Sequence, residues 1–335
     1  MNIRKIITFA LVLFAFTSCE REENSEGPNL DDLFGEFKVL DNFEVSAASV
    51  DFSTGEQVFF TSRFSTISAW EITIESTTSD AKKVIEGRSK VIDASNSIWD
   101  GSASDFPSFG TGLCTVTLLV LEDSSKQSKD VTVTGARVPN GIVVANFENG
   151  INPDWTLFKQ AGANMSFVTR DTGVVPEGSK YLDMGGEVDW DWLIGLIDFP
   201  ATAYGVNGFG LNSNPTDLYF NLILRKKPGL TNGIILFQFK EDENEDGTFT
   251  ESSEDMYSVE VKGKDLTDDW SVYSIKYTDL KALVNGAPST PNGNGQHNPD
   301  MLHTLSCLFL ADPSSGYSQA DMDLLIFTEG EALKL

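Results

Sequence analysis

The chain of 335 residues has few of the side chains from which soft-metal and redox centres are built, with three cysteines and two histidines. Cys114 and Cys307 each lie inside an apolar run, where a thiol usually serves as a small buried hydrophobic group. The two histidines, His297 and His303, share one loop at a spacing of six, which is not a standard metal pair. A metal centre built on cysteine or histidine is therefore not expected.

Motifs of several enzyme classes are also missing. The sequence has no Gly-x-Ser-x-Gly, no His-Glu-x-x-His and no Gly-rich phosphate loop. A glycoside hydrolase needs only two carboxylates at a fixed separation, so 50 acidic residues leave that class open. A β-sandwich polysaccharide lyase would need a cluster of His, Tyr or Arg on one sheet, and only Arg225 and Tyr219 are predicted to share a face. We expect a protein without catalytic activity.

Basic residues are scarce relative to acidic ones. The chain has 24 Lys and Arg against 50 Asp and Glu, which gives a formal net charge of -26. Such a surface repels nucleic acid and anionic lipid, so binding to a phosphate backbone is excluded as a function. Apolar residues make up 40% of the chain, which is enough for folded cores.

No apolar run is long enough to span a bilayer, which takes about 20 residues. The longest, residues 6–16, follows Arg4 and Lys5 and is typical of the apolar region of a signal peptide. It leads into "FTSC", which resembles a relaxed bacterial lipobox. The resemblance implies cleavage after residue 18 and acylation of Cys19, whose buried acyl carbons would each contribute about 0.8 kcal/mol of membrane anchoring. A soluble secreted protein is the alternative.

Acidic residues follow that cysteine at once. Glu20, Glu22 and Glu23 resemble the surface-export signal of Bacteroidota-type lipoproteins, which implies an outer-membrane protein facing the cell exterior. Residues 19–33 are polar and contain Gly27 and Pro28, as expected of a flexible lipidated tether. Loss of residues 1–18 removes two positive charges and changes the net charge from -26 to -28.

Almost every periodic segment alternates with period two, which predicts strands. In "DLYFNLILRKK", Leu218, Phe220, Leu222 and Leu224 share one face. Tyr257, Val259 and Val261 do so in "MYSVEVKG". The one helix we expect is short, over residues 278–284. The sequence therefore predicts an all-β protein.

A break at residues 135–141, "GARVPNG", divides these strands into two predicted domains. Residues 34–138 hold about seven short strands, as in an immunoglobulin-like sandwich. The segments "VDFSTGEQVFFTSRFSTISAWEITI" and "SIWDGSASDFPSFGTGLCTVTLLV" resemble the PKD-like spacer modules of surface glycan-binding lipoproteins. We expect Trp70 and Trp99 to be core residues. Because Cys114 and Cys307 fall in different domains, we expect no disulfide between them.

Residues 139–335 offer about ten strands, which suits a β jelly roll. "IVVANFENG", "DWSVYSIKYTDL" and "MDLLIFTEG" resemble carbohydrate-binding modules of the galactose-binding-like type. The whole layout is similar to outer-membrane glycan-binding lipoproteins of polysaccharide-utilisation systems. The resemblance implies capture of a polysaccharide or oligosaccharide, alongside an outer-membrane glycan importer and other surface lipoproteins. A surface polysaccharide lyase or glycoside hydrolase, and a scaffold or adhesion subunit that binds proteins, are the alternatives.

The segment "KEDENEDGTFTESSED" is the one candidate metal loop. Asp-x-Asn-x-Asp-Gly arranges oxygen ligands around Ca²⁺, and Gly allows the sharp turn. Eight acids between residues 241 and 255, with no base, would repel one another without a cation. The sequence therefore predicts a structural Ca²⁺ loop, with a solvated acidic turn as the alternative. Its ligands would come from Asp242, Asn244, Asp246, Thr248, Glu251 and Glu254.

Aromatic residues in turn-rich segments are the candidate sugar platforms. Trp190 and Trp192 in "EVDWDWLIG" would share a face about 7 Å apart in a strand, a spacing that lets flat rings stack on successive sugars. Asp189 and Asp191 would accept hydrogen bonds from sugar hydroxyls. Trp155 and Tyr317 are further candidates in other loops. For the three tryptophans and Tyr317 a buried position is the alternative. We expect the ligand to be a neutral glycan, because the acidic chain repels polyanions.

Overall fold

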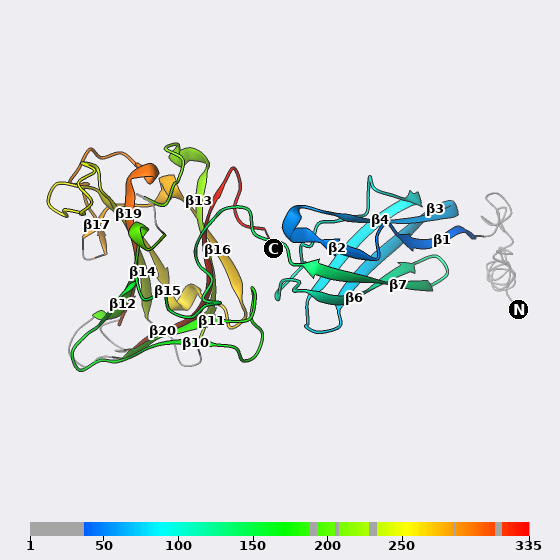
Figure 1. Ribbon diagram of the computed structural model, residues 1–335, viewed down its shortest axis with the longest axis horizontal. Helices are drawn as coiled ribbons and strands as arrows, with labels where there is room; N and C mark the ends of the chain where they lie inside the picture. The colour runs from blue at the N-terminus through cyan, green and yellow to red at the C-terminus, as the bar shows by residue number, and fades with distance from the viewer. Residues whose placement is uncertain are drawn as a thin grey trace, which may run out of the picture.

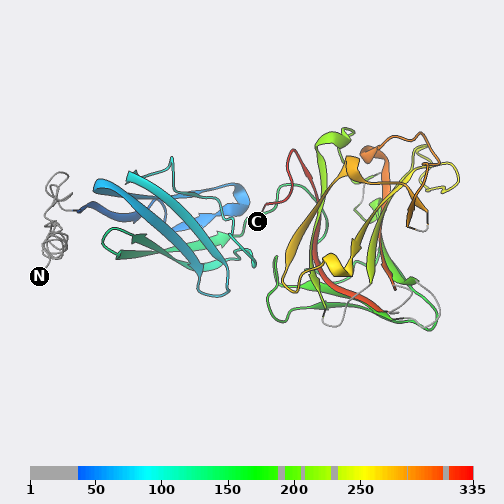
Figure 2. The same cartoon turned by 180° about the vertical axis from the view of Figure 1, so that it is seen from behind.

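The computed structural model describes residues 37–187, 193–204, 208–227, 233–284, 286–311 and 317–334. Two groups of strands follow one another along the long axis of the molecule (Figures 1 and 2). Each group encloses a hydrophobic core of its own. Among the described residues there is no α-helix, and hence no helix that could cross a membrane. The prediction of an all-β protein is confirmed.

The first group is one seven-stranded sheet in the order β1-β3-β6-β7-β2, with β4 and β5 paired to β3. Its long strand β3 bends across the core, since its first half pairs with β1 and β5 and its second half with β6. The strands are β1 (Val39–Val45), β2 (Ser49–Asp51), β3 (Val58–Ser76), β4 (Lys82–Ile92), β5 (Ile98–Trp99), β6 (Gly112–Val120) and β7 (Ser125–Gly135).

Trp70 and Trp99 lie in the core of this first group, as predicted, at 2% and 0% exposure. Trp70 is the cross-strand partner of Gly87, and a Cβ atom at Gly87 would approach the indole ring to 2.2 Å. The glycine therefore makes room for the ring. The indole N–H of Trp70 donates to the Ser89 hydroxyl at 3.0 Å. Trp99 contacts Phe52 and Phe109 edge to face.

The second group is a β sandwich of two facing sheets, the arrangement of a jelly roll. The six-stranded sheet has the order β10-β11-β20-β13-β16, with β8 paired to β20. Its strands are β8 (Ile142–Ala145), β10 (Asn164–Arg170), β11 (Tyr181–Glu187), β13 (Leu218–Lys226), β16 (Ser271–Lys276) and β20 (Tyr317–Glu329).

The facing sheet has five strands in the order β15-β14-β19-β12-β9. These strands are β9 (Thr156–Lys159), β12 (Leu193–Pro200), β14 (Ile234–Glu241), β15 (Met256–Lys262) and β19 (Leu302–Leu310). A separate hairpin pairs β17 (Leu283–Val284) with β18 (Ala287–Pro288). Short 3₁₀ turns are η1 (Phe52–Thr54), η2 (Ala201–Tyr204), η3 (Pro215–Asp217), η4 (Gly263–Asp265), η5 (Tyr277–Asp279) and η6 (Pro299–Met301).

The predicted inward faces are confirmed. Leu218, Phe220, Leu222 and Leu224 of β13 and Tyr257, Val259 and Val261 of β15 all pack in the core between the two sheets. Phe220 is at its centre, with ring centroids 5.3 Å from Phe237 and Phe327 and 5.2 Å from Phe239. This aromatic cluster holds the two sheets together.

The helix predicted over residues 278–284 is wrong. A 3₁₀ turn ends at Asp279, and Leu280 has extended backbone. Lys281 then pairs with Ser258 of β15, with backbone N–H···O distances of 2.8 and 3.1 Å. Pairing to the sheet edge satisfies the backbone groups that a helix would have paired internally.

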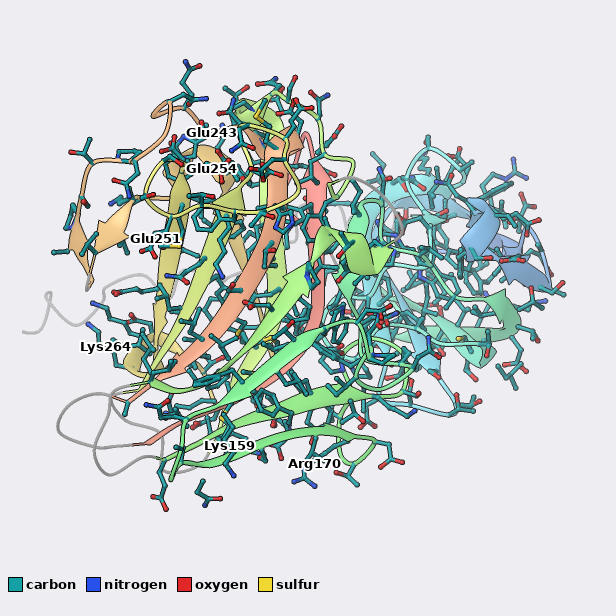
Figure 3. The ribbon with its side chains drawn as sticks, turned by 60° about the vertical axis from the view of Figure 1, so that its left-hand side comes forward. Lys159, Arg170, Glu243, Glu251, Glu254 and Lys264 are labelled. Carbon is teal, nitrogen blue, oxygen red and sulfur yellow. The ribbon has the colours of Figure 1, made fainter. Side chains whose placement is uncertain are left out.

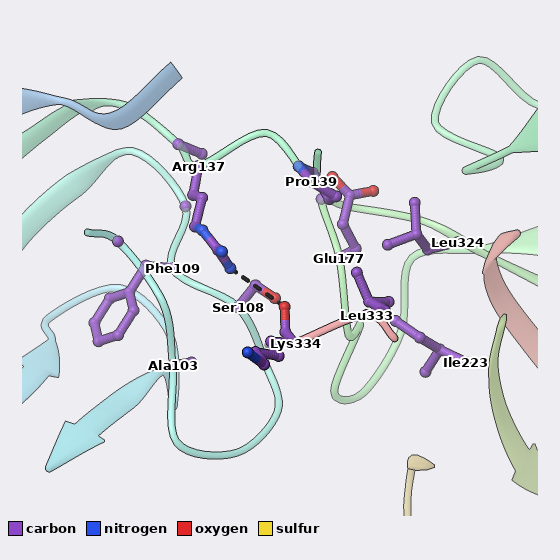
Figure 4. Close-up of a pocket in the computed structure, with 14 residues that line it drawn as sticks. Ala103, Ser108, Phe109, Arg137, Pro139, Glu177, Ile223, Leu324, Leu333 and Lys334 are labelled. Atoms are coloured by element: carbon purple, nitrogen blue, oxygen red, sulfur yellow. Dashed lines mark hydrogen bonds between the residues drawn. The ribbon is translucent and has the colours of Figure 1, made fainter. Parts of the chain in front are cut away.

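The two groups of strands touch through a short seam (Figure 4). Arg137 Nη1 donates to the carbonyl of Lys334 at 3.2 Å, and its Nε lies 3.7 Å from Asp100. The Ser108 N–H donates to the carbonyl of Pro176 at 2.8 Å. Glu177 lines a cavity of about 100 Å³ in this seam, and burial together with the charge of Glu148 raises its pKa to about 7. The contacts between the two groups of strands are made by the C-terminal tail as well as by loops.

Candidate functional site

Polar residues form one straight row across the outer face of the five-stranded sheet. The strand register places Asp198 opposite both Thr156 and Ser306, Ser306 opposite Gln238, and Gln238 opposite Ser258. One residue comes from each strand, and four inter-strand spacings make the row about 19 Å long. Paired residues of antiparallel strands point to the same face. We call these five residues the polar row.

The side chains of the polar row differ in whether their hydrogen-bonding groups already have a partner. The Ser306 hydroxyl donates a short hydrogen bond to Asp198, and Lys240 Nζ lies 3.6 Å from the same carboxylate. The Gln238 carboxamide makes no hydrogen bond within the part of the chain that the structure describes. Ser258 is 3% exposed, and its hydroxyl has no hydrogen-bond partner among the described residues. The row therefore keeps hydrogen-bonding capacity for a ligand.

Apolar residues form the neighbouring row. Leu236 is opposite Leu308, Leu308 opposite Leu196, and Leu196 opposite Phe158. The leucines of β14 and β19 are nearly buried although they face away from the main core. Phe158, on the edge strand β9, is 41% exposed. The sheet thus offers one exposed aromatic ring beside the row of hydroxyl, amide and carboxyl groups.

Two adjoining cavities lie over β14 and β15 on this face. One, of about 170 Å³, is lined by residues that include Gln238, Ser258 and Glu260 together with the β17–β18 hairpin. The other, of about 330 Å³, is lined by Gln238, Lys240, Phe249, Glu251 and Met256. Gln238 belongs to both. We call the two together the outer groove.

Figure 3 turns this sheet towards the viewer. Glu243, Glu251 and Glu254 lie toward one end of the strands, and Lys159 and Lys264 toward the other. Glu251, from the acidic end, lines both cavities of the outer groove. Carboxylates near a groove accept hydrogen bonds from hydroxyl groups and repel anionic ligands.

The six predicted calcium ligands lie in the loop between β14 and β15. Asp242 accepts hydrogen bonds from the N–H groups of Asp246 (3.2 Å) and Gly247 (2.8 Å). Asn244 accepts from Asp246, and Asp246 from Thr248. These bonds wrap the backbone around Asp242.

The rest of the predicted ligand set is more dispersed. Glu254 accepts from the N–H groups of Asn244 and Thr250, while Glu251 faces the outer groove. Within the described residues, no three Asp, Glu, His or Cys side chains come together as a group that could hold a metal ion. The oxygen donors suit Ca²⁺ in type. The calcium site remains a prediction.

The acidic segment is stabilised by backbone donors from a distant loop. Asp255 accepts hydrogen bonds from the N–H groups of Gly293 (2.6 Å) and Gly295 (2.7 Å). Glu243 accepts from Asn294, and Glu241 from Asn298. The repulsion expected between the eight acids is thus offset by backbone amides of residues 293–298.

Glu241, like Asp255, is 0% exposed within that acidic segment. Burial raises its pKa to about 8, and hydrogen bonds from the Tyr277 hydroxyl and the Asn298 N–H oppose the rise. His297 stacks on Tyr257 with ring centroids 4.0 Å apart, and its Nε2 lies 3.2 Å from the Leu280 carbonyl. These contacts fasten the loop that carries the β17–β18 hairpin.

Within the described residues, none of the predicted sugar-binding aromatic side chains is placed on the outer face of the five-stranded sheet. Trp190, Trp192, Asp189 and Asp191 lie outside the described residues. Trp155 packs against the main core, with ring centroids 4.9 Å from Phe199 and 5.9 Å from Phe147. Tyr317 was predicted in a loop but begins β20, opposite Glu187. Its side chain lies outside the described part. Their binding role remains a prediction.

The residues of the polar row were missed by sequence reasoning, although a signal was present. Asp198, Gln238 and Ser306 each interrupt an apolar strand, in "GLIDFP", "LFQFK" and "TLSCLFL". A polar residue at an outward position of such a strand is ordinary on its own. What makes the row is the register between strands that are far apart in sequence.

A second polar cluster lies on the outer face of the six-stranded sheet. Asp183 and Asp321 are direct cross-strand partners, 3% and 1% exposed at their side chains. Lys227 Nζ bridges them at 3.5 and 3.0 Å, Arg170 pairs with Asp183, and Arg225 Nε donates to Asp321 at 3.0 Å. The Arg225 guanidinium also stacks 4.5 Å over Trp270.

The charges in this second cluster compensate one another. Burial alone would raise the pKa of Asp183, but hydrogen bonds from Arg170 and Gln319 and the charge of Lys227 outweigh burial and lower it. Arg225, the residue considered above for lyase chemistry, is held by Asp321 and by Trp270. The cluster joins β10, β11, β13 and β20 by ion pairs.

Comparison with known proteins gives structural neighbours only. The chain matches no protein-family model and no curated protein. Similar solved structures include a family 11 carbohydrate-binding module from Clostridium thermocellum in complex with a β-1,3-1,4-mixed-linked tetrasaccharide. That module is 10% identical, with a TM-score of 0.39, and the match covers 59% of this chain and 99% of the module.

Two further structures resemble the chain. SGBP-B from a complex xyloglucan utilization locus in Bacteroides uniformis is 15% identical over 85% of this chain and 72% of its own, with a TM-score of 0.36. The CBM22-1 xylan-binding domain of Paenibacillus barcinonensis Xyn10C is 12% identical over 58% of this chain and 99% of its own, with a TM-score of 0.31. The description of the fold rests on the strand order and facing sheets given above.

Proposed function

We propose that the chain is a non-catalytic glycan-binding protein that captures a neutral polysaccharide at the cell surface. The observation that carries the proposal is the polar row with its adjoining outer groove. Hydroxyl, amide and carboxyl groups in line across five strands suit an extended ligand rich in hydroxyl groups. A row about 19 Å long favours several sugar rings over one.

The negative charge of the groove and of the whole chain favours a neutral ligand. Glu251 and Glu260 line the outer groove, and the chain carries a net charge of -26. A polyanion would be repelled by both, which slows encounter and weakens the complex. A shallow groove lined by one aromatic ring, that of Phe249, suggests weak binding, roughly micromolar to millimolar.

The test of this proposal is a binding screen of the full chain, solubilised in detergent, with a reducing-end assay alongside. The panel contains mixed-linkage β-glucan, xyloglucan and xylan, the glycans named for the neighbours above, together with alginate as a polyanion. Binding of a neutral glycan without new reducing ends supports the proposal. New ends or unsaturated products would favour an enzyme, and failure to bind any of them would favour a scaffold that binds proteins.

We also propose that Cys19 is acylated and anchors the protein in the outer membrane, facing outward beside a glycan importer and other surface lipoproteins. Replacing Cys19 by serine should move the protein from the membrane fraction to the soluble fraction, because the acyl chains would be its only membrane contact. The measurement is fractionation of cells followed by detergent partition. Ser25→Ala in the same tether is the control and should stay with the membrane. Wild-type protein found in the soluble fraction would refute the anchor.

Ca²⁺ bound in the loop of residues 242–254 is a further proposal. A ligand that binds only the native state stabilises it, so chelation should lower the melting temperature of the jelly roll. Asp242→Ala combined with Asp246→Ala should abolish the response to Ca²⁺, whereas Asp154→Ala, in a distant loop, should retain it. A melting curve indifferent to both Ca²⁺ and chelator would show that the loop needs no ion.

A further inference from the structure

The two ends of the polar row differ in what lies beyond them. At one end, every residue of the edge strand β9 is exposed. At the other end, Ser258 of β15 is paired with Lys281, and the chain continues from there into the β17–β18 hairpin. The row is therefore open over β9 and bordered by added chain at β15.

The hairpin closes the groove at the β15 edge. Leu283, Val284 and Gly286 line the same cavity of about 170 Å³ as Ser258 and Glu260. A Cβ atom on Gly286 would lie 3.2 Å from Glu260 Oε1, so the hairpin backbone stands directly beside that carboxylate. A chain of sugars lying along the row could not continue past β15 without moving the hairpin.

Ser258 gives a second observation at this closed end. Its side chain is 3% exposed, lines the cavity, and its hydroxyl has no partner among the described residues. A buried hydroxyl without a hydrogen-bond partner destabilises the fold, and a hydrogen bond with a ligand hydroxyl would remove that penalty. Glu260, beside it, is an acceptor for a second ligand hydroxyl.

We infer that the closed end is a terminal subsite, which holds the last sugar of a neutral glycan on Ser258 and Glu260. The rest of the glycan lies along Gln238 and Asp198, past the buried Ser306, and leaves over β9. An end residue carries a free hydroxyl where an internal residue carries a linkage, and that hydroxyl can donate to the Glu260 carboxylate. The inference rests on the proposed function and adds that the protein recognises chain ends.

Counting chain ends tests this inference. The full chain in detergent is titrated onto the mixed-linkage β-glucan, xyloglucan and xylan of the panel, each intact and each partly depolymerised, at equal mass. Cutting the mean chain length tenfold should raise the saturating amount of protein about tenfold, because one site takes one end. If the saturating amount of protein depends on the mass of polymer and not on the number of chains, the terminal subsite is overturned, although glycan binding still stands. If the protein binds none of the polymers, the proposed function itself is refuted.

Borohydride reduction of the glycan distinguishes the two kinds of end. Reduction opens the sugar ring at the reducing end and leaves the other end unchanged. Unchanged capacity assigns the terminal subsite to the non-reducing end, and loss of binding assigns it to the reducing end. Once the capacity is found to follow the number of chain ends, this comparison assigns which end the subsite holds.

The variant Ser258→Ala tests whether the chain end binds in the cavity that Ser258 lines. The variant should bind chain ends about tenfold more weakly and have a melting temperature no lower than that of the wild type, because removal of an unpaired buried hydroxyl loses no hydrogen bond within the protein. Ser166→Ala, exposed on β10 of the other sheet, is the matched control and should bind as the wild type does. Equal binding by Ser258→Ala and wild type would overturn the assignment of the end to this cavity.

Discussion

Replacing Phe220 by alanine should lower the free energy of unfolding of the jelly roll by about 3–5 kcal/mol. The ring is 0% exposed and contacts Phe237, Phe239 and Phe327, which come from both sheets. Its removal would leave a cavity that neighbours on rigid strands cannot fill, so the contacts between the sheets are lost outright. Urea unfolding followed by tryptophan fluorescence measures the change.

Phe158→Ala is the matched control for that experiment. The same ring is removed, but Phe158 is 41% exposed on the edge strand β9. Its loss should change the free energy of unfolding by less than about 0.5 kcal/mol, as for most surface substitutions. Equal destabilisation by the two variants would contradict the assignment of Phe220 to the core between the sheets and of Phe158 to the outer face of the five-stranded sheet.

A second large loss of stability is expected for Asp321→Ala, about 3 kcal/mol. The carboxylate is 1% exposed and pairs with Arg225 and with Lys227, so its removal leaves Arg225 without a carboxylate partner and Lys227 with Asp183 alone. The value is at the low end of the range for buried pairs because both cations reach solvent. Chemical unfolding at neutral pH is the measurement.

An exposed ion pair supplies the comparison for Asp321. Asp41 pairs with Arg63 at 2.8 Å, and both side chains are more than half exposed. Solvent screens such pairs, so Asp41→Ala should change stability far less than Asp321→Ala. A small effect at Asp321, no greater than at Asp41, would show that the second polar cluster does not hold the strands of the six-stranded sheet together.

The sequence was sufficient to predict the strands and their inward faces, because period-two alternation is a property of each strand by itself. Leu218, Phe220 and Leu222 pack inward as that pattern indicates. The polar row could not be predicted in the same way. Asp198, Gln238 and Ser306 meet only through the register of β12, β14 and β19, and nothing local to one strand encodes that register.

For two other segments, the sequence alone could not show contacts with residues that are distant in the chain. The repulsion within the acidic segment could be read from the sequence, whereas the hydrogen bonds that Asp255 and Glu243 accept from the backbone of a loop about 40 to 50 residues further along could not. The helix predicted over residues 278–284 does not form because Lys281 pairs with the edge of β15. In both places the partner lies outside any window that a sequence pattern covers.

The central claim is that the polar row binds a glycan, and calorimetric titration of Gln238→Ala against the glycan retained in the screen tests it most directly. Gln238 lies between Ser306 and Ser258 in the row, lines both cavities of the outer groove, and makes no side-chain hydrogen bond within the described residues. Its removal should weaken binding about tenfold, equivalent to about 1.4 kcal/mol, and leave the melting temperature unchanged. Affinity equal to that of the wild type and of the Ser166→Ala control would contradict the claim.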